Sequence, residues 1–500
     1  MTMTTTAPPS ARRDTLVLFG GLLLAMFISA LDQTIMATAL PTISGDLGGI
    51  RQLTWIVTVY VLAAAATTPI WGKLSDQLGR RLLLRAAIGT FLVGSILSGV
   101  ATSLGELVAF RAIQGAGAGG MMTLAMATVG DIVAPRERGR YQGYIQLVFV
   151  LASVVGPLLG GVLVDQLSWR WVFYVNVPIG TAALALLRRQ PVGTERRQAK
   201  IDVLGAGLLA AAVIVSMLVA EWGGDRWAWR SPQLLALVGT TVALLIGFVW
   251  QERRAAEPVL PLRLLRDQVF VVVGGAAFLA TMSLFAAIVF VPLFLQLVTG
   301  AAATTSGLLV IPMLLASAVS TTLSGRIMAR TGRYKIFPML GFAIMSAGLA
   351  LLSTVDSARG PVVVSLVVFG LGFGLTTQVL IIAIQNAVHR REIGTATASV
   401  NLFRALGGSM GVAVYGAVFA AGLRYWLPRQ LPGDPGVVDA RVIQAGPDQI
   451  RALPAAAQHG VAVSVSNALH TVFLTAAVVA AVGLVVVLYL PERPIQKETS

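Results

Sequence analysis

Asp32 is an ionisable side chain in an apolar stretch, residues 16–40, that contains no other charge. Burial of a charge in hydrocarbon costs several kcal/mol, so charged residues are rare in such stretches unless they serve a function. Ser29, Gln33 and Met36 share a helix face with Asp32, because residues three and four apart are neighbours on a helix. Burial disfavours the charged form of a carboxylate, which suits Asp32 to bind and release a proton. The ionised form would also attract a cationic ligand, so that proton and ligand would compete for one charge.

Arg111 is the natural partner of Asp32, because it is also a charged residue in an apolar stretch, LVAFRAIQGAGAGG. An opposite charge favours the ionised carboxylate. A change in the separation of the two side chains would therefore change the affinity of Asp32 for a proton. Two alternatives stay open: the pair is a fixed structural ion pair, or Asp32 only fixes helix packing through hydrogen bonds.

The stretch ASVVGPLLGGVL contains Gly156, Pro157, Gly160 and Gly161. Small residues let helices approach closely, and a proline removes one backbone hydrogen bond and permits a kink. This helix is predicted to move against its neighbours, with ordinary close packing as the alternative.

Soft, aromatic and amide side chains inside apolar stretches suit a pocket for hydrophobic ligands of varied shape. For Arg404, a role in function and satisfaction by helix-end carbonyls are equally open. The predicted ligand-binding residues are Gln33, Met36, Trp55, Tyr60, Gln114, Met121, Phe285, Gln378, Asn401 and Arg404.

The composition of the 500 residues is that of a polytopic membrane protein, with 56% hydrophobic and 12% charged residues and a mean hydropathy of +0.80. The net charge of +15 does not indicate nucleic-acid binding, because the chain has no long basic block. The absence of cysteine excludes disulfides and thiolate metal sites.

No enzymatic motif is found. His389, His459 and His470 lie far apart and outside any HExxH or HxxxxD context, and no GxxxxGK[ST] loop offers a phosphate site. We therefore expect neither an enzyme nor direct use of ATP, and we expect no cofactor and no metal.

About fourteen apolar stretches are long enough to cross the ~30 Å hydrocarbon core as helices. They are predicted near residues 16–43, 52–71, 82–101, 105–130, 141–164, 171–188, 202–221, 233–251, 269–296, 305–326, 336–354, 361–388, 395–422 and 463–490.

The distribution of Lys and Arg predicts the orientation. Of 37 such residues, 26 fall in segments on the side of the N-terminus, nine on the other side, and two, Arg111 and Arg404, inside spans. The positive-inside rule therefore places both termini in the cytoplasm. The basic charge serves orientation and contact with anionic lipid head groups.

A loop after the second span contains GKLSDQLGRRLLL, and GRIMARTGRYKIF follows 253 residues later. Gly72, Gly79 and Arg80 recur in the second segment, which predicts a duplicated six-helix unit. The glycines permit a tight turn, Asp76 can cap a nearby helix N-terminus, and Arg80 and Arg81 hold the loop at the anionic membrane face. Asp76 has no counterpart in the second copy.

The predicted fold is all-α, with two six-helix halves and two inserted helices, an architecture of transporters. The predicted divisions are a cytoplasmic N-terminal tail (1–15), an N-terminal bundle (16–188), inserted helices with charged flanks (189–267), a C-terminal bundle (268–490, with an outer loop at 423–461) and a cytoplasmic C-terminal tail (491–500).

The motifs together resemble one family. GKLSDQLGRR resembles the helix 2–3 signature of the major facilitator superfamily, with Gln77 where that pattern usually has Arg. LDQTIMATALP and LVAFRAIQGAGAGG resemble the helix 1 and helix 4 motifs of drug:proton antiporters, and ASVVGPLLGGVL resembles their antiporter motif, with Ala152 in place of the leading Gly. With WRWVFYVNVPIG, the chain resembles the fourteen-span drug:proton antiporter family of the EmrB/QacA type.

This resemblance implies the major facilitator fold and proton-driven export of hydrophobic, often cationic compounds through a cavity between the halves. It implies a part in proton transfer for Arg111, protons as the coupling ion, and a bacterial-type cytoplasmic membrane. A monomer is the working hypothesis. Alternatives are an exporter of a specific lipid, siderophore or metabolite, a passive facilitator, and, from other classes, a membrane sensor or a membrane-embedded enzyme.

Overall fold

The computed structural model describes residues 9–47, 53–133, 137–187, 202–223, 226–301, 303–355, 359–430 and 454–493. Within these ranges the regular secondary structure is helical, and the one β-bridge joins Gly223 to Trp227. The predicted all-α fold is confirmed.

The first group of helices contains the residues that the sequence singles out for chemistry. It consists of α1 (Pro9–Leu47), α2 (Leu53–Leu78), α3 (Arg80–Val100), α4 (Leu104–Ile132), α5 (Arg138–Gln166), α6 (Trp171–Tyr174) and α7 (Asn176–Leu186).

The rest of the chain begins with a helical hairpin and continues with a second group. The elements are α8 (Val203–Trp222), α9 (Pro232–Glu252), η3 (Leu264–Arg266), α10 (Gln268–Phe285), the π-helical η4 (Ala286–Phe290), α11 (Val291–Leu297), α12 (Ala303–Leu308), α13 (Ile311–Thr331), α14 (Ile336–Leu352), α15 (Arg359–Ala387), η5 (Arg390–Glu392), α16 (Ile393–Gln430) and α19 (Ala455–Leu488).

Eleven helical segments of the described chain are long and apolar enough to span a membrane, and Trp171–Leu186 and Ile336–Leu352 are shorter apolar helices. The glycine-rich α4 packs between α2 and α3 and is 29 residues long. These eleven segments, the two shorter helices and α4 coincide with the fourteen apolar stretches that the sequence predicts.

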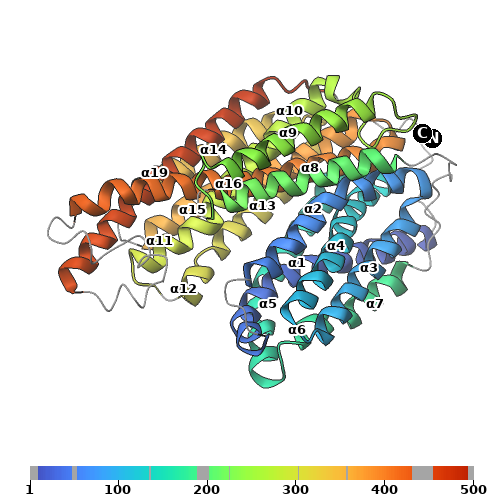
Figure 1. The fold of residues 1–500 in the computed structure, drawn as a ribbon. Helices are drawn as coiled ribbons and strands as arrows, with labels where there is room; N and C mark the ends of the chain where they lie inside the picture. Colours follow the sequence, from blue (N-terminus) through green and yellow to red (C-terminus); the bar gives the residue numbers. More distant parts are fainter. Residues whose placement is uncertain are drawn as a thin grey trace.

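The helices form two groups with a hairpin beside them (Figure 1). Helices α1 to α7, coloured blue to green, pack on one another, and α10 to α19, yellow to red, form the second group. The hairpin helix α8 packs on α9, α2 and α16 and thus contacts both groups.

Two predicted segments are more helical than expected. Helix α1 begins at Pro9, inside the predicted tail 1–15, and α16 and α19 extend into the predicted loop 423–461 from both sides. Leu423 and Leu427 are buried, so packing prolongs α16 beyond the apolar stretch that the sequence indicates. The rest of this loop (431–453), the inserted segment 189–201 and the tail residues 1–8 and 494–500 lie outside the described residues.

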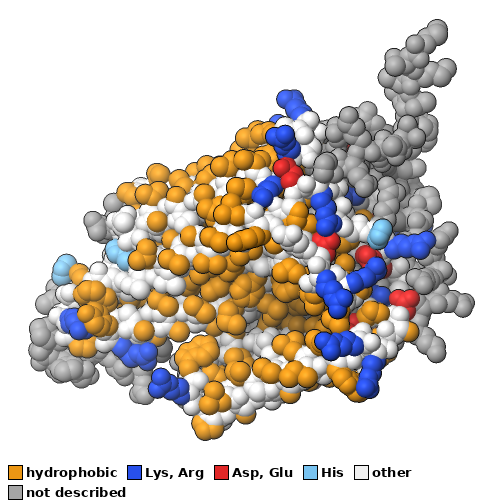
Figure 2. Space-filling model, turned by 90° about the horizontal axis from the view of Figure 1, so that it is seen from above, with side chains coloured by type: hydrophobic (Ala, Val, Ile, Leu, Met, Phe, Trp, Pro, Cys, Tyr) orange, Lys and Arg blue, Asp and Glu red, His pale blue; other side chains and the backbone are white. Residues whose placement is uncertain are grey.

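The charged side chains gather at one end of the molecule. Figure 2 shows a belt of hydrophobic side chains along the visible face, with most visible Lys, Arg, Asp and Glu at the right-hand end. We call this the α2–α3 end, because α2 ends and α3 begins there (Figure 1). Such a distribution is typical of a protein embedded in a bilayer.

Both copies of the predicted repeat have a glycine with positive φ at the turn. Gly79, between α2 and α3, has φ 97°, and Gly332, between α13 and α14, has φ 70°. These backbone conformations favour glycine, because a Cβ atom strains them. The two turns differ in geometry, however: Gly79 has ψ 137° directly before α3, whereas Gly332 has ψ 4° and ends α13 in the left-handed conformation.

Helix α5 packs closely on α1 through two of the predicted glycines. A methyl group on Gly156 would overlap the hydroxyl of Thr34, and one on Gly160 would overlap the hydroxyl of Thr38. Pro157 lies on the exposed side of α5, and nothing lies within 4 Å of a methyl group built on Gly161. The close approach of α5 to α1 thus depends on Gly156 and Gly160, which lie on the face of α5 that contacts α1.

Replacement of Gly156 by alanine is expected to lower the free energy of unfolding by about 1–3 kcal/mol, because the added methyl group separates α1 from α5. The matched control is Gly161→Ala, which has open space and should change stability by less than about 0.5 kcal/mol. Thermal unfolding of both purified variants in one detergent measures the difference. Equal melting temperatures would contradict the packing argument.

Candidate functional site

A cavity of about 1500 Å³ lies between the two groups of helices. Helices α1, α2, α4 and α5 line one side, α10, α11, α13, α15 and α16 line the other, and α8 contributes a third wall. Its volume exceeds the ~300–1,000 Å³ of common small-molecule pockets, so it has room for drug-sized ligands of varied shape among apolar and amide side chains.

Polar contacts join the two groups on the α2–α3 side of this cavity. Asn401 Nδ2 donates a hydrogen bond to Thr123 Oγ1 (3.2 Å), and Gln385 Nε2 donates one to the carbonyl oxygen of Met126 (3.3 Å). The cavity lining instead extends toward the opposite end, to the ends of α8, α11 and α16. The two groups are therefore closed against each other at the α2–α3 end.

Asp32 lies in the first group at 0% exposure, and both of its carboxylate oxygens accept hydrogen bonds. Oδ2 accepts from Arg111 Nη1 (2.5 Å), and Oδ1 accepts from Gln114 Nε2 (2.7 Å) and Asn176 Nδ2 (3.1 Å). Ser95 Oγ accepts from the same two amides, at 3.2 and 3.1 Å. Helices α1, α3, α4 and α7 thus meet at one buried carboxylate.

Arg111 connects this network to the cavity. Its Nε donates to the carbonyl oxygen of Ile56 (3.2 Å), its Nη1 donates to Gln114 Oε1 (2.8 Å), and its guanidinium lies 4.2 Å from the centre of the Tyr60 ring. Arg111 and Tyr60 line the cavity, whereas Asp32 does not. The arginine and the tyrosine therefore separate the acid from the ligand space.

Seven of the ten predicted ligand-binding residues line the cavity, namely Gln33, Met36, Tyr60, Phe285, Gln378, Asn401 and Arg404. Three lie elsewhere. Trp55 packs edge-on against Trp222 of α8, Gln114 is turned toward Asp32, and Met121 is fully buried in the core. The neighbouring Met122 lines the cavity instead of Met121, because successive helical residues point about 100° apart.

Two groups of residues were not predicted. Glu221 and Met217 of α8 line the cavity, and Thr58 Oγ1 donates to Glu221 Oε1 (3.1 Å). The signal available in the sequence was an acidic residue at the end of a predicted span. Asn176, in the stretch WRWVFYVNVPIG, and Ser95 complete the Asp32 network, but nothing in a single sequence shows that they meet.

The predicted gating loop joins the two groups at the α2–α3 end. Asp76 caps the N-terminus of α16: Oδ1 accepts from the backbone N–H of Gly394 (3.1 Å), and Oδ2 accepts from the backbone N–H and the hydroxyl of Thr395 (both 2.8 Å). The guanidinium of Arg80 lies 2.7 Å from Asp76 and 2.7 Å from Asp131. A carboxylate at a helix N-terminus is stabilised by the free N–H groups and by the helix dipole.

We call the contact between Asp76, Arg80, Asp131, Gly394 and Thr395 the latch. The other residues of the predicted gating loop support it. A methyl group on Gly72 would lie 2.5 Å from the Ala398 side chain, so glycine permits the approach of α2 to α16. Arg81 Nε donates to a carbonyl oxygen at the end of α7 (3.2 Å). Gln77 is buried, and its amide has no hydrogen-bond partner within the described residues.

Comparison with known proteins gives consistent matches over nearly the whole chain. Residues 22–412 match the family model described as Major Facilitator Superfamily. The chain is 35% identical to the multidrug transporter protein MdtP of Bacillus subtilis (strain 168), over 96% of this chain and 93% of that protein. It is 38% identical to the uncharacterized MFS-type transporter Rv1877 of Mycobacterium tuberculosis (strain ATCC 25618 / H37Rv), over 96% of this chain and 70% of that protein.

Solved structures show the same fold at low sequence identity. The human organic anion transporter MFSD10 superposes with a TM-score of 0.63 at 14% identity, over 96% of this chain and 100% of that chain. The proton:xylose symporter XylE superposes with a TM-score of 0.61 at 14% identity, over 96% of this chain and 97% of that chain.

Removal of the Asp76 charge is expected to weaken the latch, because hydrogen bonds to a charged group contribute about 1.5–3 kcal/mol each. For Asp76→Asn we expect at least a ~10-fold larger population in which the α2–α3 end is separated. Spin labels on Leu78→Cys and Arg391→Cys, introduced into this cysteine-free chain, measure the separation by pulsed electron paramagnetic resonance.

The control for this measurement is Asp165→Asn, which removes an exposed carboxylate of α5 that lies outside the latch. It should leave the label distances unchanged. An unchanged distance distribution in Asp76→Asn would show that the latch does not hold this end together.

Proposed function

Because the chain belongs to the major facilitator superfamily, we propose that it is a proton-coupled exporter of hydrophobic, cationic compounds that works by alternating access. The similarity to a relative named a multidrug transporter supports this activity. The cavity between the two groups of helices supports it as well, because its size and lining suit varied hydrophobic ligands.

The proposed orientation places the α2–α3 end and both termini in the cytoplasm of a bacterial-type cell, with the protein in the cytoplasmic membrane. The excess of Lys and Arg in the segments on the side of the N-terminus supports this orientation. The closed latch and the extension of the cavity away from it then correspond to the outward-facing state. Release of the latch would accompany the inward-facing state.

Protons are the proposed coupling ion, with Asp32 as the carrier and no cofactor. The observation that carries this proposal is a fully buried carboxylate one side chain away from the cavity, held by Arg111. Protonation of Asp32 would remove the charge that holds Arg111, and Arg111 also lines the cavity. Binding of a proton would thereby change the shape and charge of the ligand space.

Asp32→Asn is expected to abolish substrate-dependent proton movement, because the amide of asparagine does not bind and release a proton near neutral pH. The assay uses proteoliposomes with an imposed pH gradient, an internal pH-sensitive dye, and tetramethylrhodamine methyl ester as a hydrophobic cation. Binding of the dye to the purified variant should be retained, since the amide keeps the shape of the carboxylate.

The matched control is Asp46→Asn, at the end of the same helix. Asp46 is 54% exposed in its side chain and accepts a hydrogen bond from Trp169 Nε1 (2.8 Å). The Asp46→Asn variant should keep full coupling between substrate and proton movement. Full coupling in Asp32→Asn would overturn the assignment of the proton carrier.

A further inference from the structure

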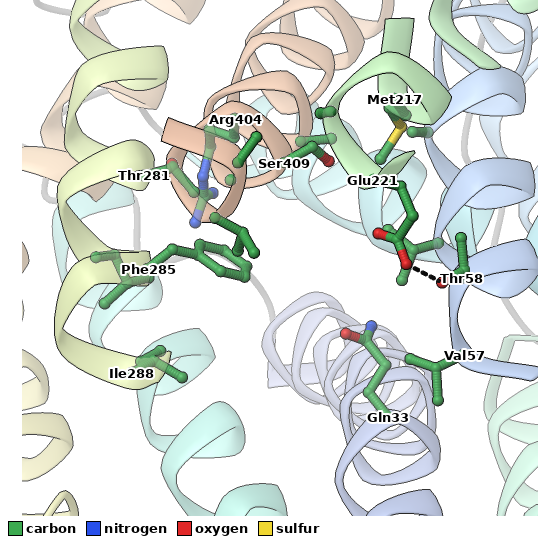
Figure 3. Close-up of a pocket in the computed structure, with 18 of the residues that line it drawn as sticks. Gln33, Val57, Thr58, Met217, Glu221, Thr281, Phe285, Ile288, Arg404 and Ser409 are labelled. Atoms are coloured by element: carbon green, nitrogen blue, oxygen red, sulfur yellow. Dashed lines mark hydrogen bonds between the residues drawn. The ribbon is translucent and has the colours of Figure 1, made fainter. Parts of the chain in front are cut away.

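Arg404 is a charged side chain without a charged partner in the described part of the chain. It lies on α16, lines the cavity, and makes no hydrogen bond or ion pair with any described residue. Figure 3 shows its guanidinium pointing into the cavity near Thr281 and Phe285. Arg111, by contrast, lines the same cavity but is neutralised by Asp32.

The second group of helices supplies no negative charge to Arg404. The α-helices α10 to α16 and α19 contain no Asp or Glu. The neighbouring cavity residues Thr281, Phe285, Ile288 and Ser409 are neutral. An unpaired guanidinium in an apolar wall is unfavourable, so an anionic group that enters the cavity would be strongly attracted to it.

Among the described residues that line the cavity, Glu221 is the one with an acidic side chain. It comes from α8, and Figure 3 shows its carboxylate pointing into the same space from the wall opposite Arg404. Thr58 donates to one of its oxygens, and no cation pairs with it within the described residues. The two walls therefore present unlike charges to one ligand space.

We propose that Arg404 binds an anionic group, such as a carboxylate, and that Glu221 binds a cationic group of the same ligand. The substrate class is then hydrophobic zwitterions. This inference rests on the proposed export function and adds a second charge to its substrates. A zwitterion offsets the charges of Arg404 and Glu221 without changing the net charge of the cavity, which favours its enclosure when the cavity closes. Arg424 also lines the cavity, but it is exposed and lies twenty residues beyond Arg404 on α16.

This assignment separates the substrate charge from the proton charge. Asp32 is absent from the cavity lining and is already paired with Arg111. A cationic group in the cavity therefore meets Glu221 and does not compete directly with a proton for Asp32. The coupling between substrate and proton then passes through movement of the helices and of Arg111.

The test uses two dyes that differ by one group. Tetramethylrhodamine has a cationic xanthylium ring and a free carboxylate, and its methyl ester has the same ring without the acid. Fluorescence anisotropy measures the dissociation constant of each dye for the full chain in lipid nanodiscs. The intact chain should bind the acid more tightly than the ester.

Arg404→Gln should weaken binding of the acid by about 10-fold or more, because one charge-assisted contact is lost, and should change binding of the ester by less than about 2-fold. Arg404→Lys should retain part of the preference for the acid. Glu221→Gln should weaken both dyes by the same factor, since both contain the cationic ring.

Arg429→Gln is the control, because Arg429 is an exposed arginine at the end of the same helix, outside the cavity lining. Elution as a single symmetric peak in size-exclusion chromatography verifies that each variant folds. Equal effects of Arg404→Gln on acid and ester, or no effect on either, would overturn the anion site. If the intact chain still exchanges the ester for protons in proteoliposomes, the proposed export function survives that failure.

Discussion

This structure depends on one constraint: charged side chains that lie within hydrocarbon must be paired. Water is absent from the bilayer core, so a charge there is retained only with a partner or next to a ligand space. Asp32 and Arg111 satisfy each other, with two amides on the remaining oxygen. Asp76 and Arg80 do the same at the membrane surface. Arg404 has no such partner among the described residues, and this difference is the basis of the proposed anion site.

Arg111 belongs to both functional parts of the first group of helices. It pairs with the buried acid, and it lines the cavity beside Tyr60. Under the proposed coupling, this double role would give proton binding at Asp32 a direct effect on the ligand space, because Arg111 would lose its charged partner. The alternative of a fixed ion pair is compatible with the same distances in one state. The two differ in whether Arg111 moves when the charge on Asp32 is removed.

The sequence predicted the number of spans and the pairing of Asp32 with Arg111, because both follow from local hydropathy and from the cost of isolated charges. Which face of a helix meets the cavity depends on tertiary packing. Gln114 and Met121 on α4 therefore face the acid network and the core, although both were predicted to bind ligand. Glu221 was overlooked because α8 belongs to the inserted pair, whose packing against α2 and α16 has no signature in one sequence.

The helix α16 connects the latch to the proposed anion site. Its first residues receive the carboxylate of Asp76, and Arg404 follows Gly394 by ten residues, which is about 15 Å along the axis. Helix α16 thus connects the residues that the latch holds to the guanidinium in the cavity. The second copy of the loop lacks the acid, with Ala329 at the position of Asp76. The second copy therefore lacks the carboxylate that caps α16 in the first copy, and the capped helix is the one that contains Arg404.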